Sequence, residues 1–147
     1  MKKALKVLAM FLVVASMAAL SSCSKKDSIV GKWQYVSATI ETTSDIPEVQ
    51  EAIPTYEAMM DLVFADMVWE FKEDGTLVVT GTYVDDEIDD ERVTYTVNGD
   101  KLTISGGEFE SETIDIETLT SKKLVLSMTE EDEDFGDIKE ILEFKRL

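Results

Sequence analysis

Short segments in which apolar and polar side chains alternate make up most of the chain, and this pattern constrains its fold more than any other feature. Alternation with a period of two is typical of strands that bury one face. Two of the intervening turn signals, Asp74-Gly75 and Asn98-Gly99, favour the positive backbone φ of tight hairpins. The pattern therefore predicts consecutive antiparallel strands. The expected strands are residues 29–41, 66–72, 76–84, 92–97, 101–105, 109–119, 122–129 and 138–146.

Eight consecutive strands with short connections predict an antiparallel meander. Closure of this meander into a barrel would remove its exposed edges. A barrel of eight strands encloses a space that side chains fill or that holds one small ligand. We therefore expect a mainly β fold, an eight-stranded antiparallel up-and-down barrel, and an open sandwich is the alternative.

The faces of two expected strands can be assigned from the alternation. In the first strand, Trp33 and Tyr35 lie on one face, and Val36, Ala38 and Ile40 lie on the other. In the sixth strand, the apolar positions change parity within residues 109–114, which predicts a β-bulge.

A helical pattern interrupts the strands at residues 44–65. Its apolar residues recur at a spacing of three and four, which predicts one apolar face. Ser44 or Asp45 can cap the start of this helix. Because Pro54 removes one helical hydrogen bond, we expect two short helices or one kinked helix. We expect the apolar face to be buried against one end of the barrel, as a lid.

The N-terminus has the pattern of an export signal. Lys2 and Lys3 precede the apolar residues 7–20, which are fewer than the roughly 20 apolar residues of a membrane-spanning helix. The segment Leu20-Ser21-Ser22-Cys23 follows and resembles the lipobox of bacterial lipoproteins. That resemblance implies cleavage before the cysteine and a diacylglycerol on its thiol.

These features divide the chain into three parts. We expect a lipoprotein signal peptide at residues 1–22 and a lipidated tether at residues 23–28, with Cys23 as the site of lipidation. Residues 29–147 are long enough for one domain with a single core. We therefore expect one β-barrel domain that is attached to a membrane through the lipid.

Several motifs in the domain resemble one family. Gly31-Lys32-Trp33 resembles the Gly-x-Trp motif of lipocalins, and residues 71–77 resemble the Phe-x-x-Asp-Gly-Thr segment of the lipocalin-like domain lipoproteins of the Bacteroidetes type. Residues 95–102 and 143–146 are also similar to that family, so the resemblance covers about residues 28–147. It implies an eight-stranded up-and-down barrel, anchoring in the outer membrane and binding of a small apolar molecule.

The resemblance also implies a structural role for one tryptophan. Trp33 would close one barrel end as a plug, and Arg146 or Lys145 would cover its ring through a cation–π contact. The helical insert is longer than the loop that the family usually has at this place.

The residues after the cysteine bear on which membrane face carries the protein. Ser24 resembles the sorting residue of outer-membrane lipoproteins. Lys25-Lys26-Asp27 is unlike the acid-rich tether expected of surface export in these bacteria. We therefore expect an outer-membrane lipoprotein on the periplasmic face.

The composition excludes several kinds of site. The chain has no histidine and one cysteine, which excludes Ser-His-Asp and Cys-His nucleophilic sites, the common histidine-containing zinc sites and any intramolecular disulfide. Nothing in the sequence marks a nucleophile, a phosphate-binding loop or a cofactor motif. We expect a protein that is not an enzyme, with no catalytic residue and no cofactor.

The charge restricts the partners. The net charge is −17, and it becomes −20 once residues 1–22 are removed, because that segment carries three lysines and no acid. Such a chain is repelled by nucleic acid, whereas a basic protein or a cation is attracted. Residues 85–91 and 130–134 are acidic connections that a meander brings to the same barrel end. They lack the spacing of a calcium loop, so we expect no metal site.

Aromatic side chains on the expected inner faces are the candidate ligand contacts. An aromatic-lined pocket would bind a small apolar ligand. The alternative is that these side chains fill the core, since aromatic residues dominate cores. The function would then be that of an acidic interaction protein, an inhibitor or complex subunit that engages a basic protein partner. The candidates are Tyr35, Trp69, Phe71, Tyr83 and Tyr95.

Overall fold

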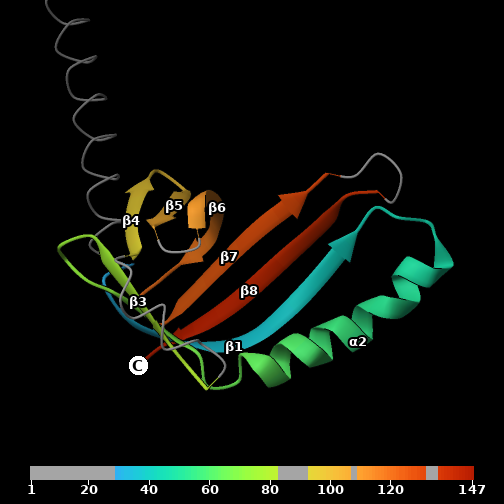
Figure 1. Ribbon diagram of the computed structural model, residues 1–147, viewed down its shortest axis with the longest axis horizontal. Helices are drawn as coiled ribbons and strands as arrows, with labels where there is room; N and C mark the ends of the chain where they lie inside the picture. Colours follow the sequence, from blue (N-terminus) through green and yellow to red (C-terminus); the bar gives the residue numbers. More distant parts are fainter. Residues whose placement is uncertain (1–28, 83–92, 107–108, 132–135) are drawn as a thin grey trace, which may run out of the picture.

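The structure is a computed structural model that describes residues 29–82, 93–106, 109–131 and 136–147. Within these ranges each strand pairs with the next and β8 returns to β1, which closes an antiparallel barrel (Figure 1). The expected mainly β, eight-stranded up-and-down barrel with a helical insert after the first strand is confirmed. The elements are β1 (Gly31–Thr42), α2 (Pro47–Val63), β2 (Val68–Phe71), β3 (Thr76–Thr80), β4 (Val93–Asn98), β5 (Lys101–Gly106), β6 (Phe109–Leu119), β7 (Lys123–Glu130) and β8 (Ile138–Arg146).

The barrel wall is continuous at one end and splayed at the other. The pairing of β1 with β2 stops at Gln34, and the pairing of β6 with β7 stops at Asp115 opposite Ser127. Beyond these points β1 and β7 remain paired with β8, so the three strands continue together as a separate sheet. Figure 1 shows β7, β8 and β1 running side by side away from β4, β5 and β6. We call the paired half the closed end and the splayed half the open end.

A bulge in β1 corrects the faces expected for that strand. The register against β8 shifts between Tyr35 and Ser37, so Val36 has no partner and points outward with 45% of its surface exposed. The extra residue reverses the alternation, because two residues of the bulged strand lie opposite one residue of its neighbour. Ala38 is therefore buried on the same side as Tyr35, and the expectation that Ala38 and Ile40 lie on the opposite face is wrong.

The local turn and bulge signals are confirmed. Gly75 and Gly99 have φ values of 86° and 63°, which glycine adopts without the steric cost that other residues meet. Asn98 pairs with Lys101 across a two-residue turn, as the hairpin signal predicts. The register of β5 against β6 shifts opposite residues 109–112, which is the bulge expected there.

The core occupies the closed end of the barrel. Inward-facing side chains of all the strands join one hydrophobic cluster there. Complete burial of a large apolar side chain contributes roughly 1.5–3 kcal/mol to folding, so this cluster is the main source of stability. With one cysteine, the chain has no intramolecular disulfide to add to it. The large side chains with less than 2% exposure are Trp33, Phe71, Phe144, Ile29, Leu102, Ile104, Leu124 and Leu126.

The start of α2 differs from the expected cap. The residue at the N-cap position is Ile46, without a side-chain hydrogen bond, and Pro47 opens the helix. Proline is well suited to this position because its fixed φ is helical and it lacks an amide hydrogen. The expected capping of the helix by Ser44 or Asp45 is therefore wrong. Pro54 lies within one continuous helix instead of dividing it into two.

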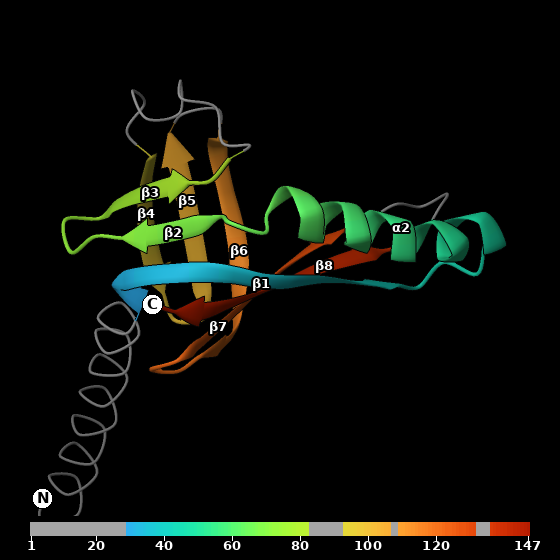
Figure 2. The same cartoon turned by 90° about the horizontal axis from the view of Figure 1, so that it is seen from below.

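Helix α2 packs along the free edge of β1. The carboxylate of Asp61 accepts hydrogen bonds from the Ala38 amide at 3.1 Å and from the Tyr35 hydroxyl at 2.7 Å. Glu57 accepts one from the Ile40 amide at 2.7 Å. These bonds satisfy β1 where β2 no longer pairs with it, and Figure 2 shows α2 beside this half of β1. The helix is thus a side wall of the open end, and the lid expected across that end does not form.

Replacing Asp61 with alanine is expected to lower the free energy of unfolding by about 1–3 kcal/mol, because the Tyr35 hydroxyl and the Ala38 amide both lose their acceptor. Urea denaturation measures this difference. Glu51→Ala on the exposed side of α2 is the matched control, and it should change stability by less than about 0.5 kcal/mol. Equal effects of the two variants would contradict the role of Asp61 as the anchor of the helix.

Candidate functional site

The predicted barrel-lining aromatic residues lie in the packed core. Trp69 and Phe71 have ring centroids 6.0 Å apart, and Phe71 and Tyr95 have centroids 4.9 Å apart, which are distances of packed rings. Tyr35 is 4% exposed on the same side of the wall. None of these four residues lines either hollow at the open end. Tyr83 lies outside the described residues.

Trp33 is completely buried in the core of the closed end. Its side chain has no exposed surface, and its indole N–H donates a hydrogen bond to the Ile29 carbonyl at 2.7 Å. The Arg146 guanidinium lies over the indole, with Cζ 4.3 Å from the ring centroid, so the cation–π contact implied by the resemblance is present. Gly31 permits this approach, because a Cβ there would lie 2.7 Å from Arg146 Nη1.

The described residues form two adjoining hollows at the open end. The first, of about 460 Å³, lies between β6 and the pair β7–β8, and the second, of about 450 Å³, lies between α2 and the pair β1–β8. Glu130, Ile138 and Glu140 line both hollows, so we treat the two as one site and call it the open-end groove. Volumes of this size are typical of small-molecule sites, which lie preferentially in places such as the mouths of β-barrels.

The hollow beside α2 is mostly apolar. Val49, Ala52 and Ile53 form its wall on the helix, and Ile40 and Ile138 face them from β1 and β8. The helix is held at the edge of β1 by the hydrogen bonds that Asp61 and Glu57 accept, so the face of α2 with these three wall residues borders the hollow. The open-end groove therefore offers an apolar surface that no described side chain covers completely.

Glu140 lies on the inner face of β8 within this groove. It pairs with Ile40 on one side and with Met128 on the other. Burial raises the pKa of its carboxyl group above the ordinary value of 4.5, because an apolar environment disfavours the charged form. No other described residue makes a hydrogen bond or an ion pair with this carboxylate. The sequence carries a signal for this site: Glu140 occupies the apolar phase of β8, between Ile138 and Leu142.

A buried tyrosine stands between the core and the open end. Burial is the main reason that the pKa of Tyr35 is raised far above its ordinary range, and the hydrogen bond to Asp61 is the next largest cause. The hydroxyl therefore stays protonated at neutral pH and continues to donate to Asp61. This keeps α2 fixed as the side wall of the open-end groove.

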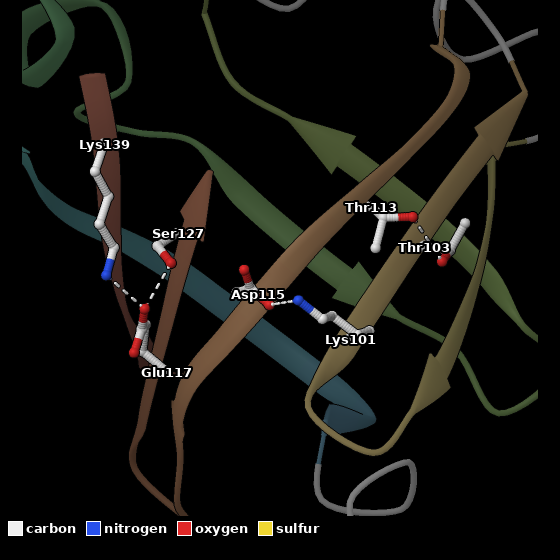
Figure 3. A network of polar contacts seen from close by, with 7 residues as sticks. All are labelled: Lys101, Thr103, Thr113, Asp115, Glu117, Ser127 and Lys139. Carbon is white, nitrogen blue, oxygen red and sulfur yellow. Dashed lines mark hydrogen bonds and ion pairs between the residues drawn. The ribbon is translucent and has the colours of Figure 1, made fainter. Parts of the chain in front are cut away.

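Polar contacts join neighbouring strands close to the place where β6 and β7 separate (Figure 3). Glu117 accepts hydrogen bonds from Lys139 at 2.7 Å and from Ser127 at 2.8 Å, and the Lys139 contact holds the pKa of Glu117 below its usual range. Lys101 forms an ion pair with Asp115 across β5 and β6. These contacts connect β5, β6, β7 and β8, so they fix the margin of the first hollow, which Asp115 and Ser127 line.

The described residues contain no group of three or more cysteine or acidic side chains arranged to hold a metal ion. Among them, no helix has the length and apolar character that crossing a bilayer requires. Residues 1–28, with the expected signal peptide and lipidated Cys23, lie outside the described ranges. The same holds for residues 85–91 and 132–134 of the two acidic connections.

Eight antiparallel strands in sequential order, closed at one end and hollow at the other, define a barrel of the ligand-binding type. The family model of the lipocalin-like domain matches residues 29–126. The chain thus belongs to the lipocalin-like domain family, and the predicted family is confirmed. Its fold is generally a binding fold without enzymatic activity. No curated protein matches the chain.

Proposed function

We propose that the protein is a binding protein that holds one small apolar molecule in the open-end groove. The observation that carries the proposal is the apolar hollow between α2 and β8, which lies in the mouth of a barrel whose other half is filled. Apolar molecules gain free energy from leaving water for such a surface. The expected ligand position is therefore above the aromatic core, and catalysis is no part of this proposal.

The test is native mass spectrometry of residues 24–147, produced in a related bacterial host without the lipid. The described core, helix and strands all lie within residues 29–147, so this chain contains the whole barrel. A discrete added mass that disappears after organic extraction would support a carrier function. A bare protein mass that stays unchanged after decanol is added would contradict it.

We further propose that the protein is anchored in the outer membrane through a lipid on Cys23, with the barrel on the periplasmic face. The support is the lipobox-like segment and the tether sequence. A chain with Cys23→Ala is expected to lose its lipid and to move from the detergent phase to the aqueous phase on phase separation, because one soluble barrel remains. Normal recovery of this variant in the detergent phase would contradict the anchor.

A second candidate function is that of an acidic interaction protein with a basic protein partner. It is supported by Glu130 and Glu131 at the end of β7, which are exposed beside the open-end groove that Glu130 lines. Binding of this kind should weaken steeply with salt, because exposed charges are screened within about 8 Å at physiological ionic strength. A partner retained unchanged at high salt would count against this function.

A further inference from the structure

We propose that the open-end groove selects molecules that combine an apolar body with a cationic amine, and that Glu140 provides the counter-charge. This inference rests on the proposed binding function and adds the chemical class of the ligand. It concerns the same groove, so the experiment below separates failure of the selectivity from failure of binding itself.

The charged side chains that line the groove are all acidic. Among the described residues, no lysine or arginine lines either hollow. A fatty acid or another anionic amphiphile would meet mostly like charges, because Lys101 pairs only with Asp115, and such like-charge contacts disfavour an anionic ligand. A ligand with a positive group would instead be attracted by these carboxylates. The charged lining residues are Glu48, Glu112, Asp115, Glu130 and Glu140.

Glu140 lies on the inner face of β8, unlike two charged residues of that strand that form ion pairs. On the same strand, Lys139 and Glu143 point outward and form ion pairs with Glu117 and Lys123, respectively. Glu140 points inward between apolar residues, where the loss of solvation opposes its charge. Glu140 is therefore a partly buried carboxylate without a partner from the described residues, whereas the other glutamates that line the groove are exposed to solvent. Removal of a charge from water is unfavourable unless a counter-charge approaches, and an ammonium group would supply it.

Polar and apolar surfaces of the groove meet at Glu140. Glu140 lines both hollows, while the apolar wall of α2 borders the second hollow alone. An amine bound to Glu140 can thus place its chain against Val49, Ala52 and Ile53. One molecule would use both surfaces, whereas an uncharged molecule would use the apolar wall only.

The experiment is calorimetric titration of residues 24–147 with three probes of equal chain length: decylamine, decanol and decanoate. At neutral pH decylamine is expected to bind about tenfold more tightly than decanol, since a charge-assisted hydrogen bond to Glu140 is added. Decanoate is expected to bind more weakly than decanol. The expected stoichiometry is one molecule per chain.

Two variants test the assigned residue. Glu140→Gln should remove the preference for decylamine and leave the affinity for decanol within about twofold, because the shape of the side chain is kept. Glu143→Gln is the matched control: it makes the same charge change on the outer face of β8 and should retain the preference. Glu140→Gln should also raise the midpoint of thermal unfolding at neutral pH, since it removes a poorly solvated charge. A higher midpoint shows that altered binding does not come from unfolding.

The outcomes separate the two proposals. If none of the probes binds, the proposed function itself fails. If decanol or decanoate binds as tightly as decylamine, the binding function stands and the selectivity is overturned. If Glu143→Gln weakens decylamine as much as Glu140→Gln does, the attraction comes from the overall negative charge and Glu140 has no special role.

Discussion

Replacing Trp33 with alanine is expected to lower the free energy of unfolding by about 3–5 kcal/mol, the usual cost of removing a large aromatic side chain from a core. The indole is completely buried, and its loss also removes the hydrogen bond to Ile29 and the platform under Arg146. Because the side chain is packed within the core cluster, its removal leaves a cavity there. Chemical denaturation monitored by circular dichroism measures the change.

Two variants make this test specific. Trp33→Phe keeps an aromatic ring but loses the N–H donor, so it should be less destabilising than Trp33→Ala. Leu62→Ala removes a side chain that is 72% exposed and should change stability by less than about 0.5 kcal/mol. If Trp33→Ala costs no more than Leu62→Ala, the indole does not act as the plug of the barrel.

Replacing Ala52 with tryptophan is expected to weaken decanol binding by more than about tenfold, because the new side chain occupies the space of the ligand. Ala52 lies on the wall that α2 contributes to the open-end groove. It is exposed in the absence of a ligand, so a larger side chain meets no described core residue. Fluorescence competition or calorimetry with decanol measures the loss.

Ala58→Trp is the control for this substitution. Ala58 is exposed on the same helix but does not line the groove, so this variant adds the same side chain outside the binding site. We expect unchanged affinity for decanol and little change in stability. Loss of binding in both variants, or in neither, would contradict the placement of the ligand between α2 and β8.

The parts of the fold that follow from the sequence depend on local patterns. The Asn98-Gly99 pair predicts its hairpin because a glycine with positive φ is a requirement of that turn. The parity change near Ile114 predicts the bulge in β6 for a similar reason, since alternation is a property of neighbouring residues. Closure of the barrel follows from strand number together with the family motifs.

The parts that do not follow depend on partners distant in the sequence. The bulge at Val36 appears only when β1 is aligned with β8, and it alone brings Ala38 to the inner face. The position of α2 depends on the β1 amides that no longer pair with β2. Asp61 and Glu57 on the helix accept hydrogen bonds from these amides. No periodicity within α2 carries that information.

The candidate site illustrates the same limit. Aromatic residues such as Trp69 and Phe71 indicate burial, but burial in a packed core and contact with a ligand give the same alternating pattern. The groove arises because β1 and β7 extend beyond their pairing with β2 and β6, which is a property of strand lengths in three dimensions. Glu140 interrupts the apolar face of β8, and an acid in that phase is the local sign of the site.

The most direct test of a ligand site at the open end is a methyl-detected NMR titration of residues 24–147 with decanol. We predict concentration-dependent shifts for the methyl groups of Ile40, Ile53 and Ile138, which line the groove, and unchanged signals for Ile104 and Leu124 in the closed core. Shifts confined to the core methyl groups, or no shifts at saturating decanol, would contradict a binding site between α2 and β8.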